Sequence, residues 1–104
     1  MAQFDVHRSL VDPPSDDVPF LLDVQSDYLE VFDVRVAIPW FRMASFTRPL
    51  HRLNPRFRVK NALVVMATQF IAGTSIRNLG EVVARLEAER DQIIGAIDML
   101  ITGV

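Results

Sequence analysis

The sequence contains few residue types that could carry out catalysis, and they lie far apart. The two histidines, His7 and His51, are distant in the chain, and neither has a partner at the spacing of a metal ligand. Cysteine is absent, which excludes a disulfide framework and a cysteine-based zinc site. The four glycines never fall into the pattern of a phosphate-binding loop. We therefore predict a protein that is not an enzyme and that carries no cofactor.

Three carboxylates stand close together in the segment DVQSDYLE, at Asp23, Asp27 and Glu30. Oxygen ligands of this kind could bind a divalent cation. If Asp23 ends a strand and the other two lie in a turn, however, the three side chains face different ways and only solvate a loop. We favour this second interpretation and predict no metal site.

Charged residues are distributed unevenly along the chain. Residues 1–34 contain eight acidic residues and one basic residue, Arg8, whereas residues 35–60 contain six arginines, one lysine and no acid. This basic stretch is either a solvated face or a surface for an acidic partner or nucleic acid. Aromatic residues are interleaved with it, and they could stack on bases or, as is more usual in a small domain, pack in the core: Trp40, Phe41, Phe46 and Phe57.

The elements that would position these residues are short strands followed by a helix. Alternation of apolar and polar residues, or an apolar run, predicts three strands, in residues 3–7, 18–25 and 34–38. The third strand should be stopped by Pro39. Residues 57–72 are typical of a hairpin with Lys60 and Asn61 at its turn, because Asn tolerates a positive φ.

The remaining segments are connections and a helix. Residues 11–17 contain two prolines and three aspartates, which predicts a loop. Residues 40–55 form either a short helical turn or an irregular excursion. From Leu79 onward the hydrophobic period becomes helical. Near the C-terminus the apolar positions of one helical face are Ile93, Ile97, Leu100 and Ile101.

Length and composition predict one domain spanning residues 1–104. Half of the residues are hydrophobic, yet a chain of this size buries only about 60–65% of its unfolded surface. The excess of apolar material predicts self-association. The N-terminal residues show no signal-peptide pattern, and the longest uncharged stretch is too short and too polar to span a bilayer. We therefore expect a cytoplasmic protein that does not enter the membrane.

Several motifs in register resemble the CcdB family, the toxins of a type II toxin–antitoxin system. They are LLDVQSDYLE, VAIP, LNP, LGEVVARL and an amphipathic helix that is followed by glycine and a β-branched residue. The likeness covers nearly the whole chain, and DVQSD is its most specific part. The sequence departs from the family in the loop HRSLVDPPSDD, which is longer and more acidic. It also carries Thr102 where the gyrase-poisoning members have a tryptophan.

This resemblance implies a fold that is mainly β with a C-terminal α-helix, an SH3-like barrel or antiparallel sheet of the CcdB type. It further implies a homodimer in which the helix ends of the two subunits converge beside the twofold axis. The hydrophobic period alone predicts one helix from Leu79 to Ile101. The resemblance implies instead that residues 79–83 are partly turn and strand, and that the helix begins near Leu86 to Ala88.

The function that the resemblance implies is inhibition by binding. A CcdB-like dimer inserts into the A subunits of DNA gyrase and traps the enzyme on cleaved DNA. Carried over by position, the contact residues would be Tyr28, Leu29, Asp98, Ile101, Thr102, Gly103 and Val104. Tyr28 offers a flat face with a hydroxyl, a type enriched in interface hot spots, and Gly103 allows another backbone to approach. The alternative for Tyr28 and Leu29 is ordinary packing in a turn.

The family also implies a cognate CcdA-like antitoxin, which neutralises the toxin and represses the operon together with it. Operator DNA would then be contacted only through the antitoxin. An antitoxin tail that is disordered when free would be acidic with apolar interruptions. Such a tail should dock on the basic stretch, at Arg42, Arg48, Arg52, Arg56 and Arg58.

Thr102 keeps two other hypotheses open. The family tryptophan stacks on an arginine of gyrase, a contact that contributes about 0.5–2 kcal/mol. Because the dimer uses the site twice, its loss could weaken binding by roughly two or more orders of magnitude. The protein could therefore be a CcdB-fold toxin with a different or lost target. The third hypothesis is a MazF-like ribonuclease, which shares the fold, although the basic stretch supplies cations without a convincing acid–base couple.

Overall fold

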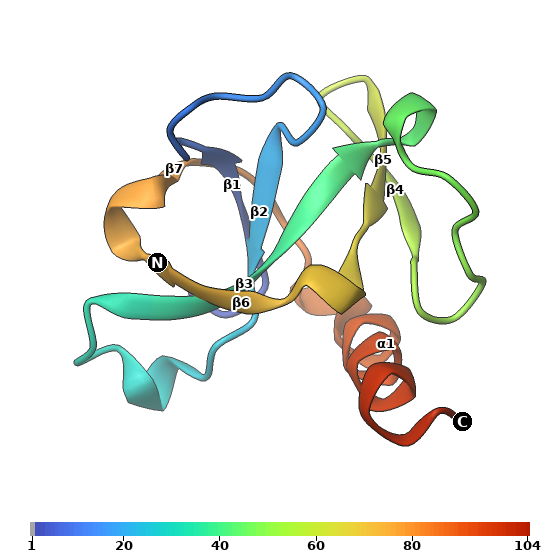
Figure 1. The fold of residues 1–104 in the computed structure, drawn as a ribbon. Helices are drawn as coiled ribbons and strands as arrows, with labels where there is room; N and C mark the ends of the chain where they lie inside the picture. Colours follow the sequence, from blue (N-terminus) through green and yellow to red (C-terminus); the bar gives the residue numbers. More distant parts are fainter. Residues whose placement is uncertain (1) are drawn as a thin grey trace.

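The structure is a computed structural model that describes residues 2–104, and it is mainly β with a C-terminal α-helix, as predicted (Figure 1). The strands in these residues are β1 (Asp5–Ser9), β2 (Phe20–Asp23), β3 (Val34–Arg42), β4 (Arg56–Val59), β5 (Ala62–Met66), β6 (Ala72–Ser75) and β7 (Leu79–Arg85). The helix is α1 (Arg90–Thr102). Short 3-10 turns lie at η1 (Asp27–Leu29), η2 (Met43–Ser45), η3 (Thr68–Phe70), η4 (Ile76–Asn78) and η5 (Glu87–Glu89).

The strands form one curled antiparallel sheet that divides at β3. Its order is β4-β5-β3-β2-β1-β7, and β6 pairs with β3 beside this path. The N-terminal half of β3 pairs with β6, from Val34 opposite Ser75, and its C-terminal end pairs with β5, from Trp40 opposite Met66. Since one long strand has two successive partners on the same side, the sheet bends around β3 into a half-barrel (Figure 1).

The predicted end of the third strand at Pro39 is wrong, because β3 continues through Pro39 to Arg42. Pro39 lies opposite Leu21 of β2. On the other side of β3, the partner changes at this point from β6 to β5, and the carbonyl of Pro39 accepts from the backbone N–H of Ala67 at 3.0 Å. A missing N–H is tolerated there because the neighbouring ladder is interrupted.

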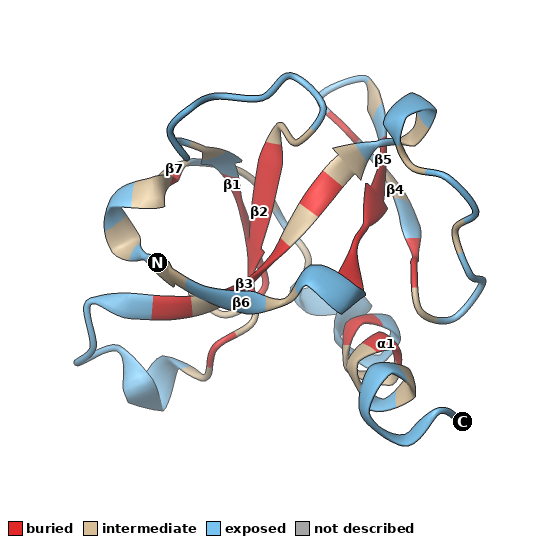
Figure 2. Cartoon of the chain, in the orientation of Figure 1, coloured by how far each residue is buried: buried red, intermediate tan, exposed pale blue. Residues whose placement is uncertain are grey.

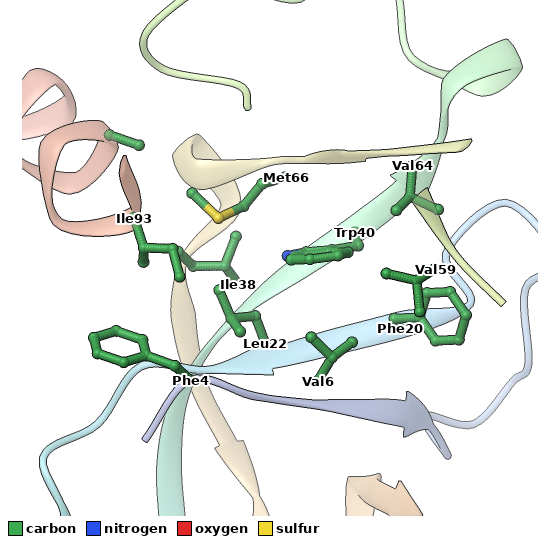
Figure 3. Packing of buried hydrophobic residues seen from close by; sticks show 11 residues of the cluster. Phe4, Val6, Phe20, Leu22, Ile38, Trp40, Val59, Val64, Met66 and Ile93 are labelled. Carbon is green, nitrogen blue, oxygen red and sulfur yellow. The ribbon is translucent and has the colours of Figure 1, made fainter. Parts of the chain in front are cut away.

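The main core lies inside the curled sheet and is closed by α1 (Figure 3). Trp40 is fully buried at its centre, and its ring stacks on Phe57 with centroids 4.9 Å apart and an interplanar angle of 9°. The helix contributes Ile93 and Ala96, which are both buried. Trp40 and Phe57 therefore pack in the core, the more usual of the two outcomes considered, whereas Phe41 and Phe46 are half-buried and contact each other outside the core cluster, with ring centroids 5.4 Å apart.

Strand β2 is buried on both faces, as its apolar run predicts. Leu22 points into the main core, whereas Leu21 packs with Ala37 and Leu79 in a second, smaller cluster. Successive side chains of a strand point to opposite faces, so β2 separates the two clusters. The second cluster lies beside buried polar groups that support the candidate site described below.

The predicted hairpin is confirmed in β4 and β5, where Val59 pairs with Ala62 around a two-residue turn. Lys60 and Asn61 have φ angles of 51° and 64°, and positive φ at both positions is the mark of a type I′ turn. Residues 11–17 are an exposed connection, as expected. Of residues 40–55, the first three belong to β3, so the prediction of a turn or an irregular excursion is wrong for them, and residues 43–45 form a short helical turn. Strand β6 was not predicted, since AGTS has weak strand propensity.

The helix begins close to the position that the family resemblance implies. Residues 79–85 form β7 and pair with β1, so the prediction of a helix from Leu79, based on the period alone, is wrong. The backbone N–H of Leu86 donates to the carbonyl of Phe4 at 2.9 Å, which fixes the end of the strand. The 3-10 turn η5 follows at once and continues into α1 at Arg90.

Candidate functional site

The C-terminal turn of α1 projects beyond the core. Burial falls along the apolar face of the helix: Ile93 is fully buried, Ile97 is half-buried, and Ile101 is 75% exposed (Figure 2). Val104 is also 75% exposed. The structure thus places the helical candidate residues on one accessible surface: Asp98, Ile101, Thr102, Gly103 and Val104.

Backbone geometry explains the glycine at this terminus. Gly103 has φ 76°, the left-handed conformation of a helix C-cap, and its N–H donates to the carbonyl of Met99 at 2.9 Å. Glycine adopts this conformation without the steric cost that a side chain brings. Apart from the two neighbouring residues in the chain, no described residue has an atom within 4 Å of the position that a Cβ would occupy, so the backbone of Gly103 is open to a partner.

Thr102 turns its side chain toward its own helix. Its hydroxyl donates to the carbonyl of Asp98 at 2.8 Å, and the backbone N–H of Val104 donates to the same hydroxyl at 3.4 Å. The residue therefore helps to satisfy the last turn of α1. It offers a partner a small polar surface and no ring on which a cation could stack.

The second group of candidate residues, Tyr28 and Leu29, lies in the connection between β2 and β3. Ser26 begins η1, and its side chain accepts from the backbone N–H of Tyr28 at 3.2 Å. Tyr28 is 96% exposed and Leu29 is 46% exposed, so ordinary packing in the turn does not account for Tyr28. Within one chain, the connection between β2 and β3 lies apart from the C-terminal end of α1 (Figure 1).

A buried ion pair lies beneath this connection. The guanidinium of Arg35 contacts the carboxylate of Asp23 at 2.8 Å, and both side chains are almost wholly inaccessible. The same guanidinium reaches Asp27 at 3.4 Å and the carbonyl of Gln25 at 3.2 Å. Burial raises the pKa of Asp23, whereas the hydrogen bond and positive charge of Arg35 oppose that rise. Asp23 ends β2 and is fully buried, and Asp27 contacts the same guanidinium, so the prediction that these carboxylates face different ways and only solvate a loop is wrong for this pair.

Gln25 links both ends of the connection. Its side-chain amide donates to the carbonyls of Leu29 and Val34, at 3.1 and 3.3 Å, and its side-chain oxygen accepts from the N–H of Val36 at 3.0 Å. A buried amide that uses donors and acceptor together is a strong local constraint, because each lost bond would leave an unpaired polar group. The backbone around Tyr28 is therefore held from below.

The arginines proposed for antitoxin binding are all exposed: Arg42, Arg48, Arg52, Arg56 and Arg58. Arg42 donates to the carbonyl of Asp16 at 2.7 Å, which ties it to the acidic loop between β1 and β2. Arg52 and Arg56 line two adjoining hollows of about 280 and 340 Å³, which share His51 and Gln92. Arg35, although part of the basic stretch in sequence, is buried and does not belong to this surface.

The two histidines have different surroundings. His7 is buried in β1, and its Nδ1 lies 2.9 Å from the carbonyl of Gly80, while Nε2 has no partner in the described chain. His51 is exposed and lines a hollow together with Arg52 and Asp91 of α1. That proximity was not evident from the sequence. Within residues 2–104, no three His, Asp or Glu side chains are arranged to hold a metal ion.

Sequence reasoning missed three residues of the connection between β2 and β3 and one residue of β3 itself, Arg35. Gln25 and Arg35 are buried supports, and Val31 and Phe32 are exposed by 82% and 57%. A signal for the second pair is present in LEVFDV, where apolar residues stand among acids outside any strand pattern. A polar turn would not need them, so their position favours contact with a partner.

Comparison with known proteins gives a family match over almost the full chain. The sequence model described as CcdB protein matches residues 3–103. No curated protein sequence matches the chain. Among the described residues, no helix is both long enough and apolar enough to cross a membrane.

Proposed function

We propose that this chain, which belongs to the CcdB family of toxins of the toxin–antitoxin type, acts by binding the A subunit of DNA gyrase. Inhibition would come from binding, with no bond of a substrate made or broken by this protein. The surfaces for gyrase are the terminus of α1, from Asp98 to Val104, and the exposed pair Tyr28 and Leu29.

The observation that carries this proposal is the exposed apolar terminus of α1. Ile101 and Val104 each expose 75% of their surface beside a glycine whose backbone is open. Exposed apolar residues that gather at one point favour protein contact. An open backbone next to them adds N–H and C=O groups for hydrogen bonds, so the terminus combines the features of a protein-binding surface.

The active form in this proposal is a homodimer located in the cytoplasm. The apolar face of α1 extends past the core, from half-buried Ile97 to exposed Leu100 and Ile101. A second copy could cover part of this face and bring two helix termini together. Gyrase would then contact four segments of the dimer, the C-terminal ends of both α1 helices and both η1 turns, which carry Tyr28.

An acidic antitoxin would neutralise the dimer by docking on the exposed arginines of the basic stretch and would carry the operator-binding domain. Support comes from Arg52 and Arg56, which line adjoining hollows into which carboxylates could reach. Operon repression would follow because the toxin binds an antitoxin that is itself bound to DNA.

A second candidate, a toxin with a changed target, is favoured by Thr102. Its hydroxyl bonds back to the helix, so the residue offers no aromatic surface to a gyrase arginine. The two candidates differ in one measurable property, the accumulation of gyrase-cleaved DNA in the presence of the purified protein.

The experiment compares gyrase-mediated DNA cleavage by wild type, Thr102→Trp and a variant that lacks Gly103 and Val104. Thr102→Trp should increase cleavage, because it adds a ring at an exposed position, and the truncation should abolish it while antitoxin binding remains. Ala88→Trp, an exposed tryptophan at the other end of the helical region, is the matched control and should behave as wild type. If neither wild type nor Thr102→Trp affects gyrase at high micromolar concentration, the target is not gyrase.

A further inference from the structure

The connection between β2 and β3 exposes more apolar surface than Tyr28 and Leu29 alone. Val31 is 82% exposed and Phe32 is 57% exposed, and both follow Glu30, the residue that caps η1. Phe32 lines a hollow of about 250 Å³ together with Glu30, Asp33 and Ile76. Neither Glu30 nor Asp33 forms an ion pair with another residue of the described chain. An aromatic ring beside two unneutralised carboxylates is a favourable environment for a cation.

The backbone of this connection is held at several points, which keeps the hollow in shape. The N–H of Gln3 donates to the carboxylate of Asp27 at 2.8 Å, and the carbonyl of Asp33 accepts from Ile76 at 3.0 Å. Gln25 binds the carbonyls on both sides of Phe32, those of Leu29 and Val34. A surface that is already ordered loses less entropy on binding, so its exposed apolar residues contribute more to affinity.

We propose that this hollow, which Ile76 also lines, binds an arginine or lysine side chain of a protein partner. The exposed side chains of Tyr28 and Val31 on the same connection would add apolar contacts to that partner. The cation would lie against the ring of Phe32 and between the carboxylates of Glu30 and Asp33. Arg35 also lines the hollow, but its charge is neutralised by Asp23 at 2.8 Å, so it does not repel the incoming cation as a free arginine would. The partner is therefore a basic protein surface with apolar residues around a protruding cation.

This inference rests on the proposed function in one respect, the identity of the partner as the gyrase A subunit. Phe32→Ser should weaken binding of the purified protein to that subunit at least tenfold, since it removes the ring that contacts the cation. Glu30→Gln and Asp33→Asn should slow association and reduce its dependence on salt. Phe70→Ser is the matched control, because Phe70 is 56% exposed and lies on a different segment.

Growth arrest after expression in bacteria separates this proposal from the gyrase assignment. If gyrase is not bound but Phe32→Ser still relieves arrest and Phe70→Ser does not, the hollow is supported and the gyrase assignment fails. If wild type binds gyrase or arrests growth and Phe32→Ser does so equally, the proposal is overturned. It is also overturned if wild type does neither.

A second copy of the chain is the competing occupant of the same surface. Sedimentation of Phe32→Ser at micromolar concentration should give the same mass as wild type. A shift to half that mass would assign the surface to self-association and overturn the proposal. Circular dichroism and thermal unfolding of each variant confirm that lost binding does not reflect lost folding.

Discussion

The substitution Arg35→Met tests the buried ion pair that supports the connection between β2 and β3, on which Tyr28 lies. The side chains of Arg35 and Asp23 are 2% and 0% exposed, and their charged atoms lie 2.8 Å apart. Methionine fills much of the space without a charge, so Asp23 would remain as a buried carboxylate without this counter-charge. Removal of one partner from such a pair costs about 3–5 kcal/mol. Since the total free energy of unfolding of native proteins is roughly 5–15 kcal/mol, the variant should lose a large part of its stability.

The loss should depend on pH in a definite direction. Burial raises the pKa of Asp23 and Arg35 opposes that rise, so without Arg35 the pKa in the folded state rises further above its unfolded value of about 3.9. Below the unfolded pKa the carboxyl is protonated in both states and the electrostatic penalty is absent. As pH rises through the pKa of the folded state, the unfolded chain gains relative stability. Arg35→Met should therefore be destabilised far more at pH 7 than at pH 4.

Urea unfolding, followed by the fluorescence of Trp40, measures this effect. Trp40 is the single tryptophan and is fully buried, so its emission reports the loss of the core. With a slope of about 1–3 kcal/mol per molar urea, the midpoint at pH 7 should fall by roughly 1 M or more. Arg56→Met, an exposed control, should change stability by less than about 0.5 kcal/mol. An equal loss for Arg35→Met at pH 4 and pH 7 would refute the electrostatic reasoning.

Four further predictions concern the backbone, the antitoxin and assembly. Gly80→Ala should destabilise the fold by about 1–3 kcal/mol in thermal unfolding, because the new Cβ would lie 2.7 Å from the carbonyl of Arg8, whereas Gly95→Ala in α1 should stabilise it by about 0.5–1 kcal/mol. K60N/N61G should stabilise the hairpin by about 1 kcal/mol in the same assay, since Asn-Gly suits two positive φ angles. Association with the antitoxin should slow markedly between low and high salt in stopped-flow measurements; a rate independent of salt would exclude the basic stretch as the docking surface. Sedimentation at micromolar concentration should give twice the mass of one chain, and a monomer would contradict the twofold mechanism.

The elements that local rules determine were predictable from the sequence. The hairpin follows from two strand-like runs around Lys60 and Asn61, and β2 follows from an apolar run that is buried on both faces. These features need only short-range periodicity and turn chemistry. The beginning of α1 required the family resemblance, because the residues of β7 also satisfy a helical period.

The misjudged elements depend on contacts between distant segments. Pro39 does not end β3, because the neighbouring strand changes at that point. Strand β6 exists because β3 is long enough to leave four residues for it to pair with, from Val34 to Ala37. No local propensity reports which strand lies beside another, so these outcomes lie beyond a reading of the sequence alone.

In the candidate site, the surroundings of a charged residue were equally hard to predict from the sequence. Arg35 stands first in a run of basic residues, and its position in sequence places it on a solvated basic face. The antiparallel register of β2 and β3 sets Asp23 opposite Ala37, which brings Arg35 and Asp23 to the same face of the sheet two positions apart. Arg35 is therefore buried and does not contribute to the basic surface. Its ion pair with Asp23 instead supports the acidic connection between β2 and β3.

The apolar face of α1 shows how one periodic pattern serves two purposes. Ile93, Ile97 and Ile101 are equally spaced and chemically identical, yet their burial falls from complete to one quarter. The pattern determines which face of the helix is apolar, whereas the position of the sheet determines how far along the helix the core extends (Figure 2). Beyond that point the same face contributes little to folding, since the hydrophobic free energy scales with the apolar area that is buried and Ile101 remains 75% exposed. The last turn is thus better explained by contact with a partner than by the fold of a single chain.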